Sequence, residues 1–117
     1  MPIKHIVLLP FKPSLSKNEI KKIMLTLADL RKDIPQIMSF SWGENNSPEN
    51  LHRGYFHGFI MEFKDDTDRK IYLEHPSHIK VAQEMVLPAL IDGVNSPIVF
   101  DYTLNWCIPL NAYDGCA

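Results

Sequence analysis

Hydrophobic positions along the chain recur in segments that predict four strands separated by two helical regions. Residues 3–11 are apolar at both parities of the strand alternation, which is typical of a strand that is covered on both faces. Three further segments have the apolar alternation or β-rich composition of strands, at residues 37–42, 55–63 and 97–102. The polar, turn-rich residues 43–50 connect two of them.

The first helical region has a clear start and a clear end. Ser16 and Glu19 have the spacing of a capping box, and Pro35 ends the helical pattern. Between them the apolar residues recur at three- and four-residue spacing, which predicts an amphipathic helix lying on a sheet. The residues expected to face the core are Ile20, Ile23, Met24, Leu27, Leu30 and Ile34.

The second helical region is interrupted by a proline. Pro76 has no N–H and disfavours helical geometry in the residue before it, so we expect one helix to stop near Glu74 and another to start at Pro76. The first piece covers residues 68–73, and the second runs to about Leu90 with Pro88 bending or ending it. The second piece is expected to turn five residues toward the core: Ile79, Ala82, Met85, Val86 and Leu90.

The order of these elements is that of a ferredoxin-like fold. Strand, helix, strand, strand, broken helix, strand is a βαββαβ pattern of the α+β class, with a four-stranded antiparallel sheet. Helices cover one face of such a sheet, and strands that are apolar at both parities need cover on the other face as well. We therefore expect a second copy to pack sheet against sheet in a two-fold dimer.

Composition narrows the range of partners and locations. The chain has 117 residues, 45% of them hydrophobic and 22% charged, which is ordinary for one globular domain. A net charge of -2, with basic residues that do not gather into a run, argues against nucleic acid and anionic lipid as partners. The sequence has neither a signal-peptide pattern nor a window of about 18 apolar residues, so we expect a cytoplasmic protein without a membrane span.

The C-terminal residues contrast with the rest of the chain. We expect residues 1–102 to form the domain and residues 103–117 to form a tail, because the tail has turn signals and little periodicity. Trp106 and Ile108 would let this tail pack against a neighbour. Cys107 and Cys116 match no zinc or redox spacing.

The segment from Tyr72 to His78 contains the strongest candidate chemistry in the chain. Its tyrosine and two histidines, His75 and His78, lie on either side of Pro76, and the helix break would aim all three at one place. Tyrosine and histidine donate, accept and transfer protons. The alternative is structural: His75 caps the second helix and His78 lies at the surface on its first turn.

Two further histidines are weaker candidates, and a metal site is disfavoured. His5 shares its strand parity with apolar residues, where a lone histidine is more often a satisfied interior residue than a catalyst. His57 precedes Gly58, and a glycine in a strand often marks close approach by another group. His75 and His78 do not have the helical geometry of metal motifs because Pro76 lies between them. We expect neither a metal nor a cofactor.

Five short segments occur in the order and at the approximate spacing of a known family. They are Ile3-Lys4-His5-Ile6-Val7, Ile34-Pro35, Arg53-Gly54-Tyr55-Phe56-His57-Gly58, Tyr72-Leu73-Glu74-His75-Pro76-Ser77-His78 and Val99-Phe100-Asp101-Tyr102. Together they resemble the stress-responsive dimeric α/β-barrel (Dabb) family over about residues 1–102, and the His-Pro-x-His segment is the most specific of them. The resemblance implies a ferredoxin-like protomer, two copies of which form a barrel, and a role in the stress response.

The resemblance also implies roles for individual residues. A family member that closes a linear polyketide into an aromatic ring uses a tyrosine and a histidine that match Tyr72 and His78. Histidines that match His5 and His57 lie in the same pocket of that member. We therefore assign Tyr72 and His78 as candidate catalytic residues, and His5, His57 and His75 as candidate ligand-binding residues.

Two functional hypotheses follow, and the sequence leaves both open. In the first, His78 is a general base that removes a proton next to a carbonyl, and Tyr72 orients it or donates to the enolate oxygen, in cyclase or lyase chemistry. In the second, the pocket holds a small apolar or aromatic molecule without changing it. A non-catalytic stress-response or structural dimer with no bound substrate is the remaining alternative.

Overall fold

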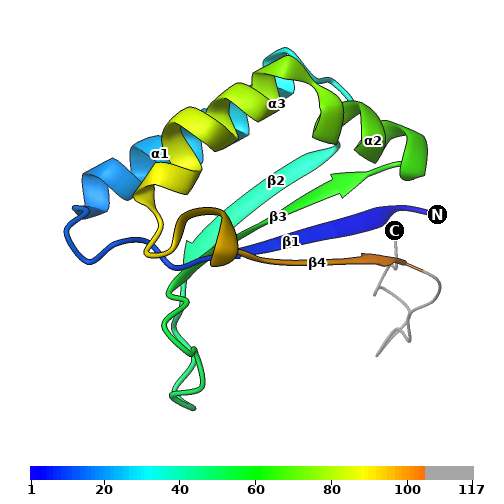
Figure 1. Ribbon diagram of the computed structural model, residues 1–117. Coiled ribbons are helices and arrows are strands. Elements are labelled where there is room, and N and C mark those ends of the chain that lie inside the picture. Colours follow the sequence, from blue (N-terminus) through cyan, green and yellow to red (C-terminus); the bar gives the residue numbers. More distant parts are fainter. Residues whose placement is uncertain (105–117) are drawn as a thin grey trace.

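The computed structural model describes residues 1–104, and within them a four-stranded antiparallel sheet carries helices on one face (Figure 1). The tail contacts expected through Trp106 and Ile108, and both cysteines, lie outside the described residues. The strand order in the sheet is β2-β3-β1-β4. The strands are β1 (Ile3–Leu9), β2 (Ser39–Glu44), β3 (His57–Phe63) and β4 (Ile98–Thr103).

The helical elements follow the expected order, so the ferredoxin-like βαββαβ fold is confirmed. Within residues 1–104, no helix combines the length and the apolar character that a membrane crossing requires. The α-helices are α1 (Lys17–Asp29), α2 (Asp66–Glu74) and α3 (Pro76–Val81), and the remaining helical segments are 3-10 turns at Leu30–Lys32, Leu87–Ala89 and Gly93–Asn95 and a π-helical turn at Ala82–Val86.

Helix α1 begins as the sequence predicted and ends earlier. The Ser16 hydroxyl accepts from the amide of Glu19, and the Glu19 carboxylate accepts from the amide of Ser16, both at 3.1 Å. After Asp29 the helix tightens into the 3-10 turn, and the amide of Ile34 donates to the carbonyl of Leu30 at 2.8 Å before Pro35. All six residues expected to face the core are buried.

The second piece of the broken helix turns four of its five expected residues inward and one outward, with Ala82 lining a cavity and Met85 packed against the core. Val86 and Leu90 are buried as expected, but Ile79 is 40% exposed. His78 lines a cavity that faces the sheet, and the next residue is turned by about 100° around a helix of 3.6 residues per turn. Ile79 therefore points outward because His78 occupies the inward position.

Pro88 explains the wide helical turn that precedes it. Proline has no N–H, and its ring clashes with the carbonyl four residues earlier. The chain widens instead, and the amide of Leu87 donates to the carbonyl of Ala82, five residues back. This π-helical turn places Ala82 and Val86 on the same cavity as His78.

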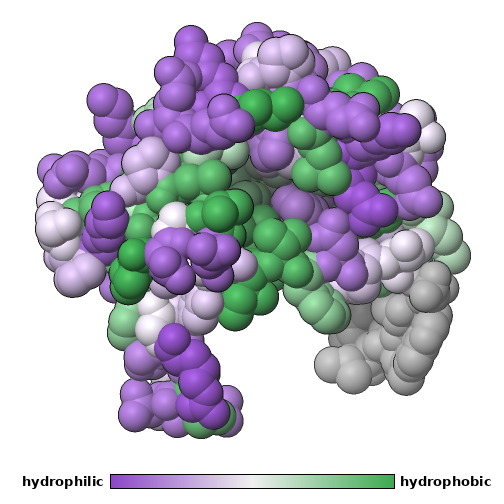
Figure 2. All heavy atoms as spheres, viewed as in Figure 1, coloured by the Kyte–Doolittle hydropathy of each residue, from purple (hydrophilic) through white to green (hydrophobic). Residues whose placement is uncertain are grey.

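The sheet has one covered and one open face. Strand pairing sets Ile6 between Ile60 and Phe100, and Leu8 between Gly58 and Ile98, all on the face opposite the helices. Phe100 is 61% exposed there. Figure 2 shows apolar side chains along the lower side of the sheet, away from the helices. Within the described residues this apolar face has no cover.

Two leucines of α1 differ in burial, and this difference predicts how much each contributes to the free energy of unfolding. Leu27 is 3% exposed and belongs to the core, whereas Leu25 on the same helix is 49% exposed. We expect Leu27→Ala to lower the free energy of unfolding by about 2–5 kcal/mol, because it removes buried methyl groups and leaves a void. Leu25→Ala is the matched control and should change it by less than about 1 kcal/mol. Urea titration measures both, and equal losses would contradict the packing of α1.

Candidate functional site

A cavity of about 210 Å³ lies between the covered face of the sheet and the broken helix. His5 of β1, Tyr72 of α2 and His78 of α3 line it. The rest of its wall is apolar: Val7, Leu9, Leu27, Phe59, Leu73, Ala82, Val86, Leu87, Pro97 and Val99. A mostly apolar lining with a few polar groups is the composition typical of a small-molecule site.

The break at Pro76 brings two of these side chains together. His75 has extended backbone angles (φ -68°, ψ 132°), ends α2 and begins α3. Tyr72 lies in the last turn of α2 and His78 in the first turn of α3, and their ring centroids are 4.2 Å apart. A continuous helix would separate these residues by six positions, about 9 Å along the axis and about 120° around it.

His75 caps a helix at this break. Its Nδ1 accepts a hydrogen bond from the amide of Ser77 at 3.0 Å, which satisfies one of the free amides at the start of α3. This contact is the one expected from the alternative prediction that His75 caps the second helix. The cavity that contains His78 does not include His75.

The surroundings of His78 favour a neutral imidazole with one free nitrogen. Its Nδ1 lies 3.2 Å from the carbonyl oxygen of Leu73, and because a carbonyl only accepts, Nδ1 carries the hydrogen. In the neutral ring, Nε2 then keeps its lone pair. Burial lowers the pKa of His78; the Leu73 carbonyl opposes that effect, and the nearby His5 and His75 lower the pKa further.

The pKa of Tyr72 shifts in the opposite direction, so the phenol stays protonated. Its side chain is 1% exposed, and its ring lies against those of His5 and Phe63, with centroids 5.8 and 5.1 Å away. Burial raises the pKa of the phenol, and the negative charge of Asp101 raises it further. At neutral pH, Tyr72 is therefore a hydrogen-bond donor.

His5 is held by a carboxylate that the sequence analysis had not assigned. His5 is 5% exposed, and its Nδ1 lies 2.8 Å from Oδ1 of Asp101 on β4. Arg69 donates from Nη1 to Oδ2 of the same carboxylate at 3.2 Å. Asp101 lies opposite His5 in the register of β1 and β4, and a single acid in an apolar strand was the available signal in the sequence.

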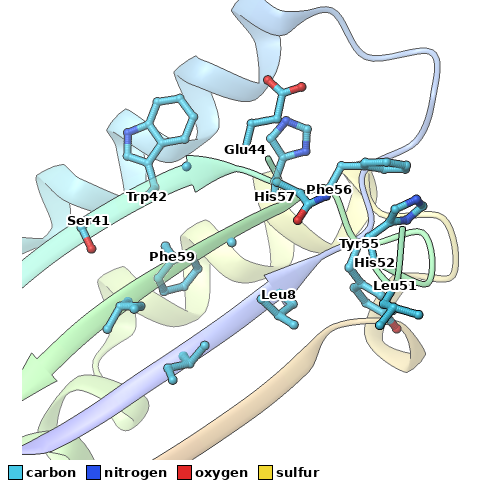
Figure 3. A pocket seen from close by; sticks show the side chains of 15 residues that line it. Leu8, Ser41, Trp42, Glu44, Leu51, His52, Tyr55, Phe56, His57 and Phe59 are labelled. Carbon is cyan, nitrogen blue, oxygen red and sulfur yellow. The ribbon is translucent and has the colours of Figure 1, made fainter. Parts of the chain in front are cut away.

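His57 lies apart from these three residues. Its ring packs edge-on against Phe11, with centroids 5.4 Å apart. It lines a separate hollow of about 400 Å³ at the start of β3, beside Glu44 and near Phe56 (Figure 3). The structure therefore brings His5, Tyr72 and His78 together and leaves His57 and His75 outside their cavity.

Metal ligands are not gathered anywhere in the described part of the chain. Within residues 1–104, no group of three or more histidine, cysteine, aspartate or glutamate side chains is arranged to hold a metal ion.

Curated proteins with similar sequences come from plants. The chain is 32% identical to the stress-response A/B barrel domain-containing protein HS1 of Arabidopsis thaliana over 101 residues, covering 86% of this chain and 88% of that protein. It is 27% identical to olivetolic acid cyclase of Cannabis sativa over 79 residues, covering 68% of this chain and 78% of that protein.

Solved structures share the fold. A hydroxynitrile lyase from Passiflora edulis superposes with a TM-score of 0.79 at 24% identity, covering 92% of this chain and 97% of that one. A dimeric ferredoxin-like protein from Jannaschia sp. CCS1 gives 0.77 at 24% identity, covering 88% and 99%. The model of the stress-responsive A/B barrel domain (Dabb) matches residues 3–104. The chain therefore belongs to the Dabb family.

Proposed function

We propose that the cavity binds a small apolar or aromatic molecule that carries a carbonyl group, and that His78 acts on it as a general base. The observation that carries this proposal is the convergence of His5, Tyr72 and His78 on the wall of an otherwise apolar cavity. A general base must be unprotonated at working pH and within hydrogen-bond reach of its substrate. The lowered pKa of His78 supports the first condition.

The chemistry follows from the protonation states of the two side chains. Nε2 of His78 takes a proton from the carbon next to the carbonyl, and the bonding electrons move to give an enolate. The Tyr72 phenol, which keeps its proton, donates a hydrogen bond to the developing enolate oxygen. Ring closure follows when the enolate carbon attacks a second carbonyl of the same molecule, whose π electrons move to its oxygen, and that oxygen takes the proton back from His78.

A lyase reaction uses the same base in a different way. His78 then removes the proton of a hydroxyl group, the carbonyl forms, and the neighbouring carbon–carbon bond breaks with its electrons leaving on the departing carbon. The names of two similar proteins, a cyclase and a hydroxynitrile lyase, support these reaction classes as the ones to test. His5, held by Asp101, contributes a further polar group to the same wall.

The open face of the sheet supports a homodimer. Ile60, Ile98 and Phe100 are 38%, 42% and 61% exposed on one surface, and contiguous apolar patches of this kind mark interaction sites. Structurally similar proteins are described as dimeric. We propose that a second copy packs on this face and completes a dimeric α/β barrel. A stress-response role and a cytoplasmic location stay predictions from the sequence.

Substitutions in the cavity separate catalysis from simple binding. In an assay of β-polyketo thioesters and aromatic cyanohydrins, we expect His78→Ala to abolish turnover and Tyr72→Phe to lower it by roughly ten- to a hundredfold, the scale of one lost hydrogen bond to developing charge. His52→Ala is the control, because His52 lies outside this cavity. Turnover that survives His78→Ala would contradict the general base, and inactivity across the panel would favour the binding hypothesis.

The pH dependence of turnover reports on His78. Its imidazolium cannot accept a proton, so kcat/KM should fall as the pH drops through the His78 pKa of the free enzyme. Because burial lowers that pKa, the fall should lie below the ordinary value of about 6.5, with a plateau at neutral pH. An NMR titration of the histidine ring protons checks the assignment. A His78 that titrates above its ordinary value would contradict the proposed environment.

Light scattering tests the dimer. We expect about twice the 13.5 kDa chain mass at micromolar concentration. Phe100→Lys should shift the protein toward monomer, because it places a charge in the apolar interface. Leu25→Lys is the matched control: Leu25 is also exposed, at 49%, but lies on α1 across the sheet. A wild-type monomer at all accessible concentrations would overturn the proposed barrel.

A further inference from the structure

Beside the hollow of Figure 3 lies another, of about 390 Å³, beyond the Leu9 end of β1 and outside the cavity that holds His78. The two neighbouring hollows share Glu44, Phe56 and His57. Its walls come from the segment before α1, the first turns of α1, the neighbouring ends of β2 and β3, and Ile91. His57, which the sequence had assigned to a ligand pocket, lines this hollow. The proposed reaction uses none of these residues.

The interior of this hollow is apolar. Phe11 and Ile20 are each 8% exposed and belong to the core, and the His57 ring meets Phe11 edge-on. At the rim, Phe56 and Ile91 are 46% and 60% exposed. Exposed apolar side chains around a concave apolar surface are typical of a ligand site.

Backbone hydrogen bonds hold the walls in place. The amide of Lys12 donates to the carbonyl of Ala89 at 2.9 Å. The amide of Ile91 donates to the carbonyl of Pro10 at 3.1 Å. Across the hollow, the amide of Asn45 donates to the carbonyl of Phe56 at 2.7 Å. The hollow is therefore formed before a ligand arrives, which reduces the entropy lost on binding.

The charges at the rim favour an anionic group. Lys12 and Lys17 both line the hollow and are exposed, and neither forms an ion pair with another residue in the described range 1–104. Glu44 supplies one opposing carboxylate and lies beside His57 on the adjacent strand (Figure 3). The rim thus carries two ammonium groups and one carboxylate, and the His57 ring adds a hydrogen-bond donor.

We propose that this hollow is a second ligand site, which binds a small carboxylic acid with an aromatic or aliphatic body. The body lies between Phe11, Ile20 and Phe56, and the ionised carboxylate lies toward Lys12 and Lys17. The site goes beyond the proposed function because neither His78 nor Tyr72 contributes to it.

A series of ligands with one apolar body and different charges tests this assignment. We would titrate the full chain with 4-phenylbutyrate, 4-phenylbutan-1-ol and 4-phenylbutylamine and follow the backbone amides by NMR. The acid should shift the amides of Lys17, Gly54 and His57. The alcohol should bind several-fold more weakly because it lacks the charge, and the amine should bind weakest because both lysines repel it.

Matched variants locate the binding and separate it from the His78 cavity. Lys17→Gln should weaken 4-phenylbutyrate binding by about three- to tenfold, within the range of one charge-assisted contact. Lys21→Gln on the same helix should leave it unchanged, because Lys21 does not line the hollow. His78→Ala should also leave 4-phenylbutyrate binding unchanged. The test of this site is therefore independent of the test of the proposed function in the His78 cavity.

Three results would overturn the second site. Equal affinity for the acid and the alcohol would remove the role of the lysines. Shifts confined to amides around Tyr72 and His78 would assign the acid to the other cavity. Changes at Gly54 and Lys17 that depend on protein concentration without ligand would show that a second copy covers the hollow.

Discussion

The candidate site depends on one constraint, the interruption of a helix by Pro76. Proline lacks an amide hydrogen and forces the preceding residue out of helical geometry. His75 therefore adopts an extended conformation and caps the new helix through Nδ1. The change of direction turns Tyr72 and His78 toward each other over the covered face of the sheet, where burial adjusts the pKa of each in the direction that its proposed role requires.

The sequence predicted the local features of the fold because each has a local cause. The Ser16–Glu19 capping box and the helix break at Pro76 are set by nearby residues, and the structure contains both. The six buried positions of the first helical region follow in the same way from spacing alone. The sequence did not predict the outward position of Ile79. The rotation of α3 about its axis follows from the placement of His78 toward the cavity, and not from the spacing of apolar residues within α3.

Long-range features of the site could not be predicted from spacing. Asp101 meets His5 only because β4 pairs with β1 in one particular register. His5 on β1 and His57 on β3 lie on the same face of the sheet. Because the two strands run antiparallel, His57 pairs with Leu9, whereas His5 pairs with Met61 further along the ladder. The two histidines therefore lie in different hollows of the same covered layer.

The central claim is that the cavity presents His78 and Tyr72 to one carbonyl compound. A crystal structure of the protein soaked with an aromatic β-diketone tests it directly, because the stable enol of such a compound imitates an enolate. We predict density inside the cavity, with one diketone oxygen about 2.6–3.2 Å from the Tyr72 hydroxyl and the ligand within reach of His78 Nε2. A diketone bound only outside this cavity, or side chains that fill it, would contradict the account.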